Sequence, residues 1–398
     1  MTQKTLLLPL ILLLLSTLVA CSSESKNRTQ ADKAAQYNLI KVDSIRIDKL
    51  EAIQITDLDA ENRRLLAYAT STKKCLELDM NGNILTEVDL TGEGPGHFGV
   101  GLTELGYFGD GKIIHGPAVY FTYADDWTYQ DRIVYNANGY SIPLRYIDGA
   151  PMVMKTESEN LLIRVIDHNA GGVLKLEPGY FETASMISTF RAGAEEGRQI
   201  LSYPENSIYR TSDLFYNAHR PKVSFNRFKN QLVLALPLEQ KLYRYDVDND
   251  FALVETIDIV LTGFNTELRG LAYEDQHKNS LKGFGPSNEL NYVYSLTNSA
   301  ILDVYSEGDV TIVAHKTGFS NSSITNYREA NSLARTESKT ITSFFIGGKK
   351  VFETDERFPR LVRLSERQFI VPNENEEIER DYNQYDIYEL SEKIEIDR

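Results

Sequence analysis

Short segments in which apolar and polar residues alternate recur along most of the chain, for example Cys75–Met80, Ile84–Leu90 and Ile301–Tyr305. A period of two places apolar side chains on one face of a β-strand. The 3.6-residue period of a helix is rare. Its two candidates, Asn265–Ser280 and Ile324–Ala334, are polar enough to be loops that contain a helical turn. The pattern therefore predicts an all-β fold.

Tight turns join many of the predicted strands. Met80-Asn81-Gly82-Asn83 and Ser306-Glu307-Gly308-Asp309 each connect two successive runs. Asn-Gly and Gly-Asp pairs supply the positive φ angles that short hairpins require. The unit of strand, hairpin turn, strand and longer loop recurs about every 50–65 residues, as expected for the four-stranded blades of a propeller.

We predict a six-bladed β-propeller with four-stranded antiparallel blades. The predicted blades cover, in order, residues 50–91, 103–148, 150–190, 208–260, 265–316 and 340–398. The preceding run, Leu39–Ile47, is expected to complete the last sheet and close the ring, because closure removes strand edges that invite aggregation. Two alternatives stay open, namely a seventh blade within residues 190–225 and a pair of β-sandwiches.

The N-terminus has the pattern of a lipoprotein signal peptide. Lys4 is the first charged residue, and an apolar run extends from Leu6 to Ala20. This run is shorter than the roughly 20 apolar residues of a spanning helix, and it fits a secretory signal. Leu18-Val19-Ala20-Cys21 resembles the lipobox, after which the cysteine thiol is acylated. The alternative is an ordinary signal peptide followed by a chance cysteine.

The chain accordingly divides into three parts. Residues 1–20 are predicted to be the signal peptide, residues 21–35 a polar flexible tether, and residues 36–398 a single propeller domain. We predict that lipid on Cys21 anchors the protein to the outer membrane of the cell envelope. The sequence leaves open whether the domain faces the periplasm or the cell exterior.

The chain is acidic, with 398 residues and a formal net charge of −15. Because residues 1–20 carry one charge, that of Lys4, the chain from Cys21 onward has a net charge of −16. Such acidity argues against nucleic acid as a partner, since phosphate binding needs clustered Lys and Arg. It also argues against adsorption to anionic lipid headgroups beyond the tether. The charge favours solubility and suits cationic ligands.

The segment Thr91-Gly92-Glu93-Gly94-Pro95-Gly96-His97-Phe98 follows the outer strands of the first predicted blade. A Gly-x-Gly-Pro-Gly-acid-aromatic loop at this place resembles the six-bladed β-propeller lipoproteins of bacteroidete-type gut bacteria, many of which are domains of unknown function. His97 occupies the acidic position and departs from the pattern, and Gly283-Phe284-Gly285-Pro286 is a partial second copy. The resemblance covers essentially the whole chain. It implies the propeller fold and an envelope location, and it supplies no catalytic mechanism.

The glycines of this loop also have a direct physical interpretation. Glycine adopts positive φ without a steric penalty and proline fixes its own φ, so Gly92–Gly96 predicts a tight crossover between blades. The alternative is a loop whose backbone amides line the central channel and bind an anion. Phosphate binding of the P-loop kind is excluded, because no Gly-Lys-Ser/Thr follows.

Motifs for catalysis or metal binding are missing from the sequence. The six histidines are scattered, and neither His-Glu-x-x-His, Cys-x-x-Cys nor Gly-x-Ser-x-Gly occurs. With Cys21 lipidated, Cys75 has no partner for an internal disulfide, and its place in an alternating run predicts a small structural residue. We predict no catalytic residue, no metal and no cofactor.

Two aromatic segments are candidates for ligand binding. Tyr120–Tyr129 combines the single tryptophan with two acids, and Asn206–Arg220 has a similar composition. Aromatic faces beside carboxylates suit sugars or cations. The candidate residues are Tyr123, Asp125, Asp126, Trp127, Tyr216, His219 and Arg220. Both segments are expected beside the same channel mouth; the alternative for Tyr120–Tyr129 is a hairpin whose aromatics pack between blades.

These observations favour a binding module at the cell envelope, with envelope proteins or glycans as partners. Propellers present loops on a rigid scaffold, and ligands collect where such loops converge. The alternative is an envelope enzyme, either a lactonase-like hydrolase or a glycan-cleaving propeller.

Overall fold

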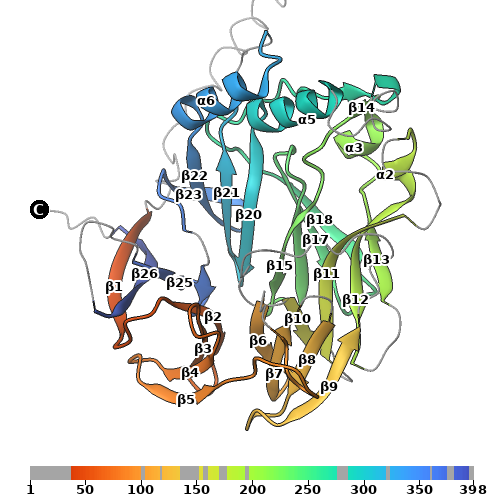
Figure 1. The fold of residues 1–398 in the computed structure, drawn as a ribbon. Helices are drawn as coiled ribbons and strands as arrows, with labels where there is room; N and C mark the ends of the chain where they lie inside the picture. The colour runs from red at the N-terminus through yellow and green to blue at the C-terminus, as the bar shows by residue number, and fades with distance from the viewer. Residues whose placement is uncertain are drawn as a thin grey trace, which may run out of the picture.

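The chain folds into a ring of six four-stranded antiparallel sheets in the computed structural model (Figure 1). The structure describes residues 37–99, 104–116, 119–134, 152–155, 160–169, 177–192, 197–275, 286–319, 323–358, 361–373 and 381–393. The predicted all-β, six-bladed propeller is confirmed, and the seven-bladed and sandwich alternatives are wrong. The predicted signal peptide, tether and lipidation site at Cys21 lie outside the described residues. No helix among the described residues has the length and apolar character needed to cross a membrane.

Five blades are each formed by one continuous segment of the chain. Blade 1 contains β2 (Ile53–Asp59), β3 (Arg64–Ala69), β4 (Cys75–Asp79) and β5 (Ile84–Val88). Blade 2 contains β6 (Glu104–Phe108), β7 (Gly111–His115), β8 (Val119–Tyr123) and β9 (Tyr129–Val134). Blade 3 contains β10 (Met152–Lys155), β11 (Asn160–Asn169), β12 (Ala184–Phe190) and β13 (Arg198–Ser202). Blade 4 contains β15 (Lys222–Asn226), β16 (Gln231–Ala235), β17 (Lys241–Asp246) and β18 (Ala252–Asp258). Blade 5 contains β20 (Ala300–Glu307), β21 (Val310–Lys316), β22 (Thr340–Ile346) and β23 (Lys349–Thr354).

The sixth blade joins the two ends of the propeller. Its strands, from inside to outside, are β24 (Val362–Arg363), β25 (Gln368–Pro372), β26 (Asn383–Glu392) and β1 (Tyr37–Ile47). The register of the closing pair runs from Tyr37 opposite Glu392 to Ile47 opposite Asn383. The prediction that the run before blade 1 completes the last sheet is therefore confirmed.

The predicted limits of several blades need correction. Blade 5 was expected within residues 265–316, but it spans 300–354, because helix α6 (Tyr327–Glu337) separates its second and third strands. Residues 340–354, assigned to blade six, therefore belong to blade 5. Blade 3 extends to Ser202, and blade 4 begins at Lys222 because a helix and a short strand precede it.

The two helix candidates have different outcomes. Ile324–Ala334 overlaps α6, whose N-cap Asn326 accepts hydrogen bonds from two backbone amides of the first turn. The described part of Asn265–Ser280 contains only a short strand and a single helical turn. The sequence does not predict helix α5 (Pro286–Thr297), because Tyr292–Leu296 alternates in the way that indicates a strand.

The direction of the strands gives the ring two different ends. In each antiparallel blade the first two strands are joined at one end, as are the last two, whereas the second-to-third and blade-to-blade connections lie at the other end. Helices α2 (Tyr180–Thr183), α3 (Ile208–Thr211), α5 and α6 all belong to connections of the latter kind. We call this end the helical end and the opposite one the hairpin end. In Figure 1 these helices lie along the top and upper right of the molecule, and β8 and β9 lie at the bottom.

The core is divided among the seams between blades. Each of the six seams contains a cluster of buried apolar side chains, and a smaller cluster lies beneath α5 and α6. The alternation along β16 shows how this arises: Leu232 and Leu234 pack toward blade 3, whereas Val233 and Ala235 pack toward blade 5. The inner strands are thus buried on both faces, and each blade depends on both neighbours.

The crossover from blade 1 to blade 2 is the glycine-rich loop identified in the sequence. Gly92, Gly94 and Gly96 have φ angles of 121°, 152° and 77°. A Cβ atom on Gly96 would lie 2.6 Å from the side chain of Tyr129, so no larger residue fits there. The prediction of a tight crossover is confirmed.

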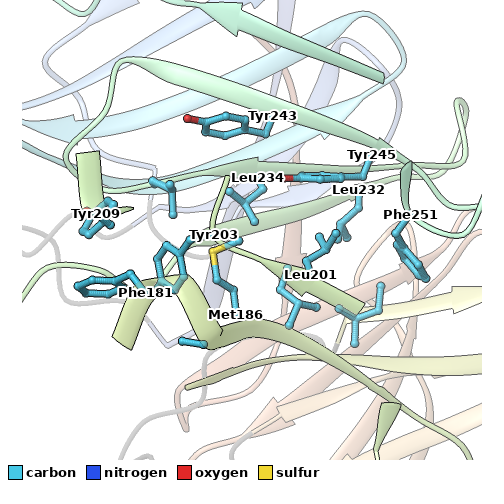
Figure 2. Packing of buried hydrophobic residues seen from close by; sticks show 14 of the residues in the cluster. Phe181, Met186, Leu201, Tyr203, Tyr209, Leu232, Leu234, Tyr243, Tyr245 and Phe251 are labelled. Carbon is cyan, nitrogen blue, oxygen red and sulfur yellow. The ribbon is translucent and has the colours of Figure 1, made fainter. Parts of the chain in front are cut away.

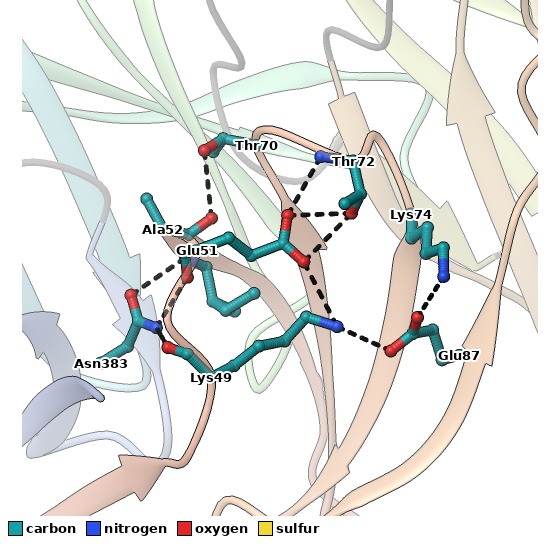
Figure 3. A network of polar contacts seen from close by, with 9 residues as sticks. Lys49, Glu51, Ala52, Thr70, Thr72, Lys74, Glu87 and Asn383 are labelled. Atoms are coloured by element: carbon teal, nitrogen blue, oxygen red, sulfur yellow. Dashed lines mark hydrogen bonds and ion pairs between the residues drawn. The ribbon is translucent and has the colours of Figure 1, made fainter. Parts of the chain in front are cut away.

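Polar contacts hold the connection between the closing blade and blade 1 (Figure 3). The Asn383 side-chain amide donates to the carbonyl oxygens of Lys49 and Glu51, at 2.8 and 2.9 Å. Lys49 Nζ lies 2.7 Å from a carboxylate oxygen of Glu87, which also contacts Lys74. Deeper in the seam, the Tyr385 hydroxyl donates to Ile53 O at 2.5 Å and accepts from Ile55 N at 3.0 Å.

The substitution Tyr385→Phe tests this closing contact. It removes a buried hydroxyl that serves two backbone groups of blade 1, so we expect the free energy of unfolding to fall by about 1–3 kcal/mol. Urea denaturation followed by circular dichroism measures the change. Tyr388→Phe, on the same strand, is the matched control, because its hydroxyl makes no hydrogen bond with the described residues, and it is expected to change stability little. Equal effects of the two substitutions would contradict the assignment.

Candidate functional site

A pocket of about 410 Å³ opens at the helical end, beside blades 3 and 4. It lies between α2, α3 and the segment that follows β19 (Leu271–Ala272). The lining combines aromatic, acidic and small polar residues: Pro178, Gly179, Phe181, Glu182, Tyr209, Arg210, Thr211, Ser212, Asp213, Ala272, Tyr273 and Glu274. Three connections that are distant in sequence therefore build one concave surface.

The floor of the pocket belongs to the core between blades 3 and 4 (Figure 2). Phe181 and Tyr209 are almost fully buried and meet edge to face, with ring centroids 5.4 Å apart. Tyr203, which does not line the pocket, packs edge to face against Phe181, with ring centroids 4.9 Å apart. Edge-to-face aromatic packing fixes ring orientation, so the floor is a rigid platform.

Hydrogen bonds from blade 4 fix the position of α3. The backbone amide of Ile208, the first residue of the helix, donates to Glu239 Oε1 at 2.6 Å. Tyr243 donates to the other oxygen of the same carboxylate at 2.5 Å, and burial raises the pKa of Glu239. The Tyr209 hydroxyl donates to Ala218 O and accepts from Leu238 N. The hydroxyl of Tyr209 is therefore used within the fold, and its ring borders the pocket.

A two-stranded sheet brings the third wall into place. Strand β14 (Leu214–Phe215) pairs with β19, so that Tyr273 and Glu274 lie against the end of α3. The approach is close at Gly270, where a Cβ atom would lie 2.8 Å from the ring of Tyr216. Glycine is required at this position because any side chain would push the two connections apart.

The rim of the pocket is acidic. Glu182, Asp213 and Glu274 are exposed, and none of them forms an ion pair with another described residue. Burial, with a contribution from the Glu182 carboxylate, raises the pKa of Tyr273 to about 12. Arg210 is the one cationic residue in the lining, and its guanidinium donates to Tyr203 O at 3.2 Å.

The predicted segment Asn206–Arg220 takes part in this site, but through other residues than those expected. Its residues from Tyr209 to Asp213 line the pocket. Tyr216 is buried behind the lining, with its hydroxyl 3.2 Å from Ser212 Oγ. His219 is buried as well, with Nδ1 2.7 Å from Asn217 O, and Arg220 is exposed outside the pocket.

The other predicted segment lies at the opposite end of the ring. Asp125, Asp126 and Trp127 belong to the β8–β9 hairpin, and Tyr123 is the last residue of β8. The expectation that both segments flank one channel mouth is therefore wrong, because third-to-fourth strand turns and blade-to-blade connections lie at opposite ends of a propeller. Tyr123 and Trp127 are buried in the seam between blades 1 and 2, which agrees with the alternative of inter-blade packing.

The acids of that hairpin have structural partners. Asp125 accepts a hydrogen bond from the fully buried Lys112 at 2.7 Å and contacts Arg64 at 3.2 Å, and the Lys112 hydrogen bond lowers the pKa of Asp125. Asp126 is exposed and accepts from the backbone of Thr128 at 3.0 Å. Asp125 thus compensates buried positive charge in the seam.

Two further sequence predictions concern chemistry. Cys75 is a buried free thiol in β4, and burial raises its pKa, as fits a structural residue. Among the described residues, no group of three or more His, Cys, Asp or Glu side chains is arranged to hold a metal ion.

The sequence does not reveal four residues of the pocket, Phe181, Glu182, Tyr273 and Glu274, because they lie in short connections without any recognisable motif.

The known proteins that this chain resembles are similar to it in fold. No protein-family model matches the chain, and no curated protein sequence matches it. A crystal structure of a DUF4221 family member from Bacteroides vulgatus is similar over 91% of this chain and 100% of that chain, with 11% identity and a TM-score of 0.61. A Bacteroides fragilis protein described as exported matches over 92% and 98%, with 10% identity and a TM-score of 0.46. A gluconolactonase from Xanthomonas campestris matches over 91% and 94%, with 7% identity and a TM-score of 0.38.

These similarities support the propeller fold alone. The first agrees with the resemblance to bacteroidete propellers of unknown function that the glycine-rich loop suggests. Its identity is too low to transfer a function, and the TM-scores of the other two are too low to support any argument.

Proposed function

We propose that this protein is a lipid-anchored β-propeller of the bacterial cell envelope that binds a ligand in the pocket at its helical end. The pocket itself is the observation that carries this proposal. Its volume of about 410 Å³ lies within the range of about 300–1,000 Å³ typical of small-molecule sites. A rigid aromatic floor and a polar rim drawn from three connections are also typical of binding sites on rigid scaffolds.

The position of Tyr37, the first described residue, supports access to this pocket. Tyr37 begins β1 opposite Glu392, and the guanidinium of Arg367, from the β24–β25 hairpin, lies 5.8 Å above its ring. The propeller therefore starts at the hairpin end. A tether that leads there from a lipidated Cys21 would join the propeller opposite the pocket and leave the helical end open to ligands.

The expected partners follow from the same features. The net charge of −16 from Cys21 onward disfavours nucleic acid, and the pocket suits part of an envelope glycan or an envelope protein. The alternative of an envelope hydrolase or glycan-cleaving enzyme stays a prediction, and no contact described above favours it.

The anchor is tested by Cys21→Ser in the producing bacterium. We expect the wild-type protein to incorporate a clickable palmitate analogue and to sediment with membranes, and the variant to do neither, because it lacks the thiol that carries lipid. Cys75→Ala, which removes the other cysteine, is the control and should behave as wild type. Unchanged labelling and sedimentation of Cys21→Ser would contradict the anchor.

The pocket is tested with a defined panel of surface glycans and purified envelope components. We expect a panel member to bind wild type and to lose at least about tenfold in affinity with Tyr273→Ala, which removes a wall, and with Thr211→Trp, which fills the space. Tyr292→Ala is the matched control, because this tyrosine is exposed on α5 outside the pocket. Biolayer interferometry measures the dissociation constants. Panel members that bind all four proteins equally would argue against the pocket.

A further inference from the structure

We propose that the pocket between α2, α3 and β19 takes an organic ammonium ligand, a compound that joins a positively charged amine to an apolar or aromatic ring. The inference rests on the proposed function, in that it assigns a ligand class to the same site. It follows from the distribution of charge around the cavity and from the aromatic groups that face it.

The carboxylates of the rim come from three separate elements. Glu182 lies in α2, Asp213 follows α3, and Glu274 follows β19. With Arg210 as the single cation of the lining, the cavity carries an excess of two negative charges. A ligand cation in this pocket would therefore meet an excess of negative charge, which attracts it.

Some acids elsewhere on the propeller are neutralised by cationic side chains of the fold. Glu87 contacts two lysines, Asp125 contacts Lys112 and Arg64, and Glu307 contacts Arg227. Within the described residues, the three carboxylates of the rim have no such cationic partner. Arg210 does not supply one, because its guanidinium donates to the backbone carbonyl of Tyr203 behind the pocket.

The aromatic lining of the pocket suits the apolar or aromatic ring of the ligand. Tyr273 is half-buried at the wall, close enough to Glu182 for that carboxylate to affect its hydroxyl, and Phe181 and Tyr209 form the floor. Ring faces attract ammonium groups and pack against apolar rings. One ligand can therefore place its charge at the rim and its ring toward the floor.

Other ligand charges fit the site less well. An anion would be repelled by the excess negative charge and would find only Arg210 as a counterion. A neutral ring compound would gain the aromatic contacts without the electrostatic ones. Among ligands of the same shape, the affinity of the pocket should therefore be lowest for an anion, higher for a neutral compound and highest for a cation.

Three probes of nearly equal shape test this order, namely phenethylammonium, 2-phenylethanol and phenylacetate. Isothermal titration of the full chain in detergent should give phenethylammonium a dissociation constant at least about tenfold lower than that of 2-phenylethanol, with no binding of phenylacetate. Added sodium chloride should weaken the ammonium complex and leave the alcohol complex unchanged.

A triple variant, Glu182→Gln, Asp213→Asn and Glu274→Gln, tests whether the rim carboxylates cause the preference for the ammonium compound. It should lose at least about tenfold in affinity for phenethylammonium and keep its affinity for 2-phenylethanol, because only the charge is removed. Glu337→Gln, an exposed acid on α6 outside the pocket, is the control and should bind as wild type. The altered side chains are all exposed, and equal melting temperatures would verify that the fold is retained.

Several results would overturn the ligand class. Equal affinity for the ammonium and the alcohol would show that charge plays no part, although the pocket would still stand as a site. Ammonium binding that the triple variant leaves unchanged would place the cation elsewhere, and absence of binding by all three probes would reject the class outright. The pocket variants with the glycan and envelope panel decide the proposed function separately.

Discussion

Burial of both faces of the inner strands is the constraint on which this propeller depends. Along β7, Ile113 packs toward blade 3 and Ile114 toward blade 1, and β16 divides its residues in the same way. Fully burying one such side chain contributes about 1.5–3 kcal/mol, so a blade that lacks a neighbour loses several of these contributions. An open row of blades would therefore leave two apolar faces in water. Pairing of β1 with β26 removes that cost by making the first and last segments of the propeller neighbours.

Closure also determines where ligands can meet the molecule. Because the seams are filled with side chains, concave surfaces arise at the ends of the ring, and strand direction decides which connections reach each end. The short turns between first and second strands, and between third and fourth, meet at the hairpin end, where Lys112 and Asp125 neutralise each other. The longer connections meet at the helical end, where β14 and β19 draw two of them together over the pocket. The site is thus a consequence of connection length and topology.

Much of the fold was predictable because its causes are local. Alternation in Cys75–Asp79 and Ile84–Val88, joined by Asn81-Gly82, identifies strands and turn together, and the run before blade 1 was recognised as the closing strand. Blade 5 was misplaced because α6 interrupts it, and a local pattern does not show which strands pair across an insertion. The site was less predictable for the same reason. Aromatic residues beside acids occur both in the buried seam between blades 1 and 2, which contains Trp127, and at the open pocket, so this pattern does not distinguish the two. The pairing of Leu214–Phe215 with Leu271–Ala272 involves too few residues to give a periodic pattern in the sequence.

We infer that the ligand binds at the helical end of the ring and not at the hairpin end. A crystal structure of the protein grown with phenethylammonium tests it most directly. We expect electron density for the compound between Tyr273 and the rim carboxylates, with its ring toward Phe181 and Tyr209. Density beside Asp125 and Trp127 at the hairpin end, with an empty pocket at the helical end, would contradict it.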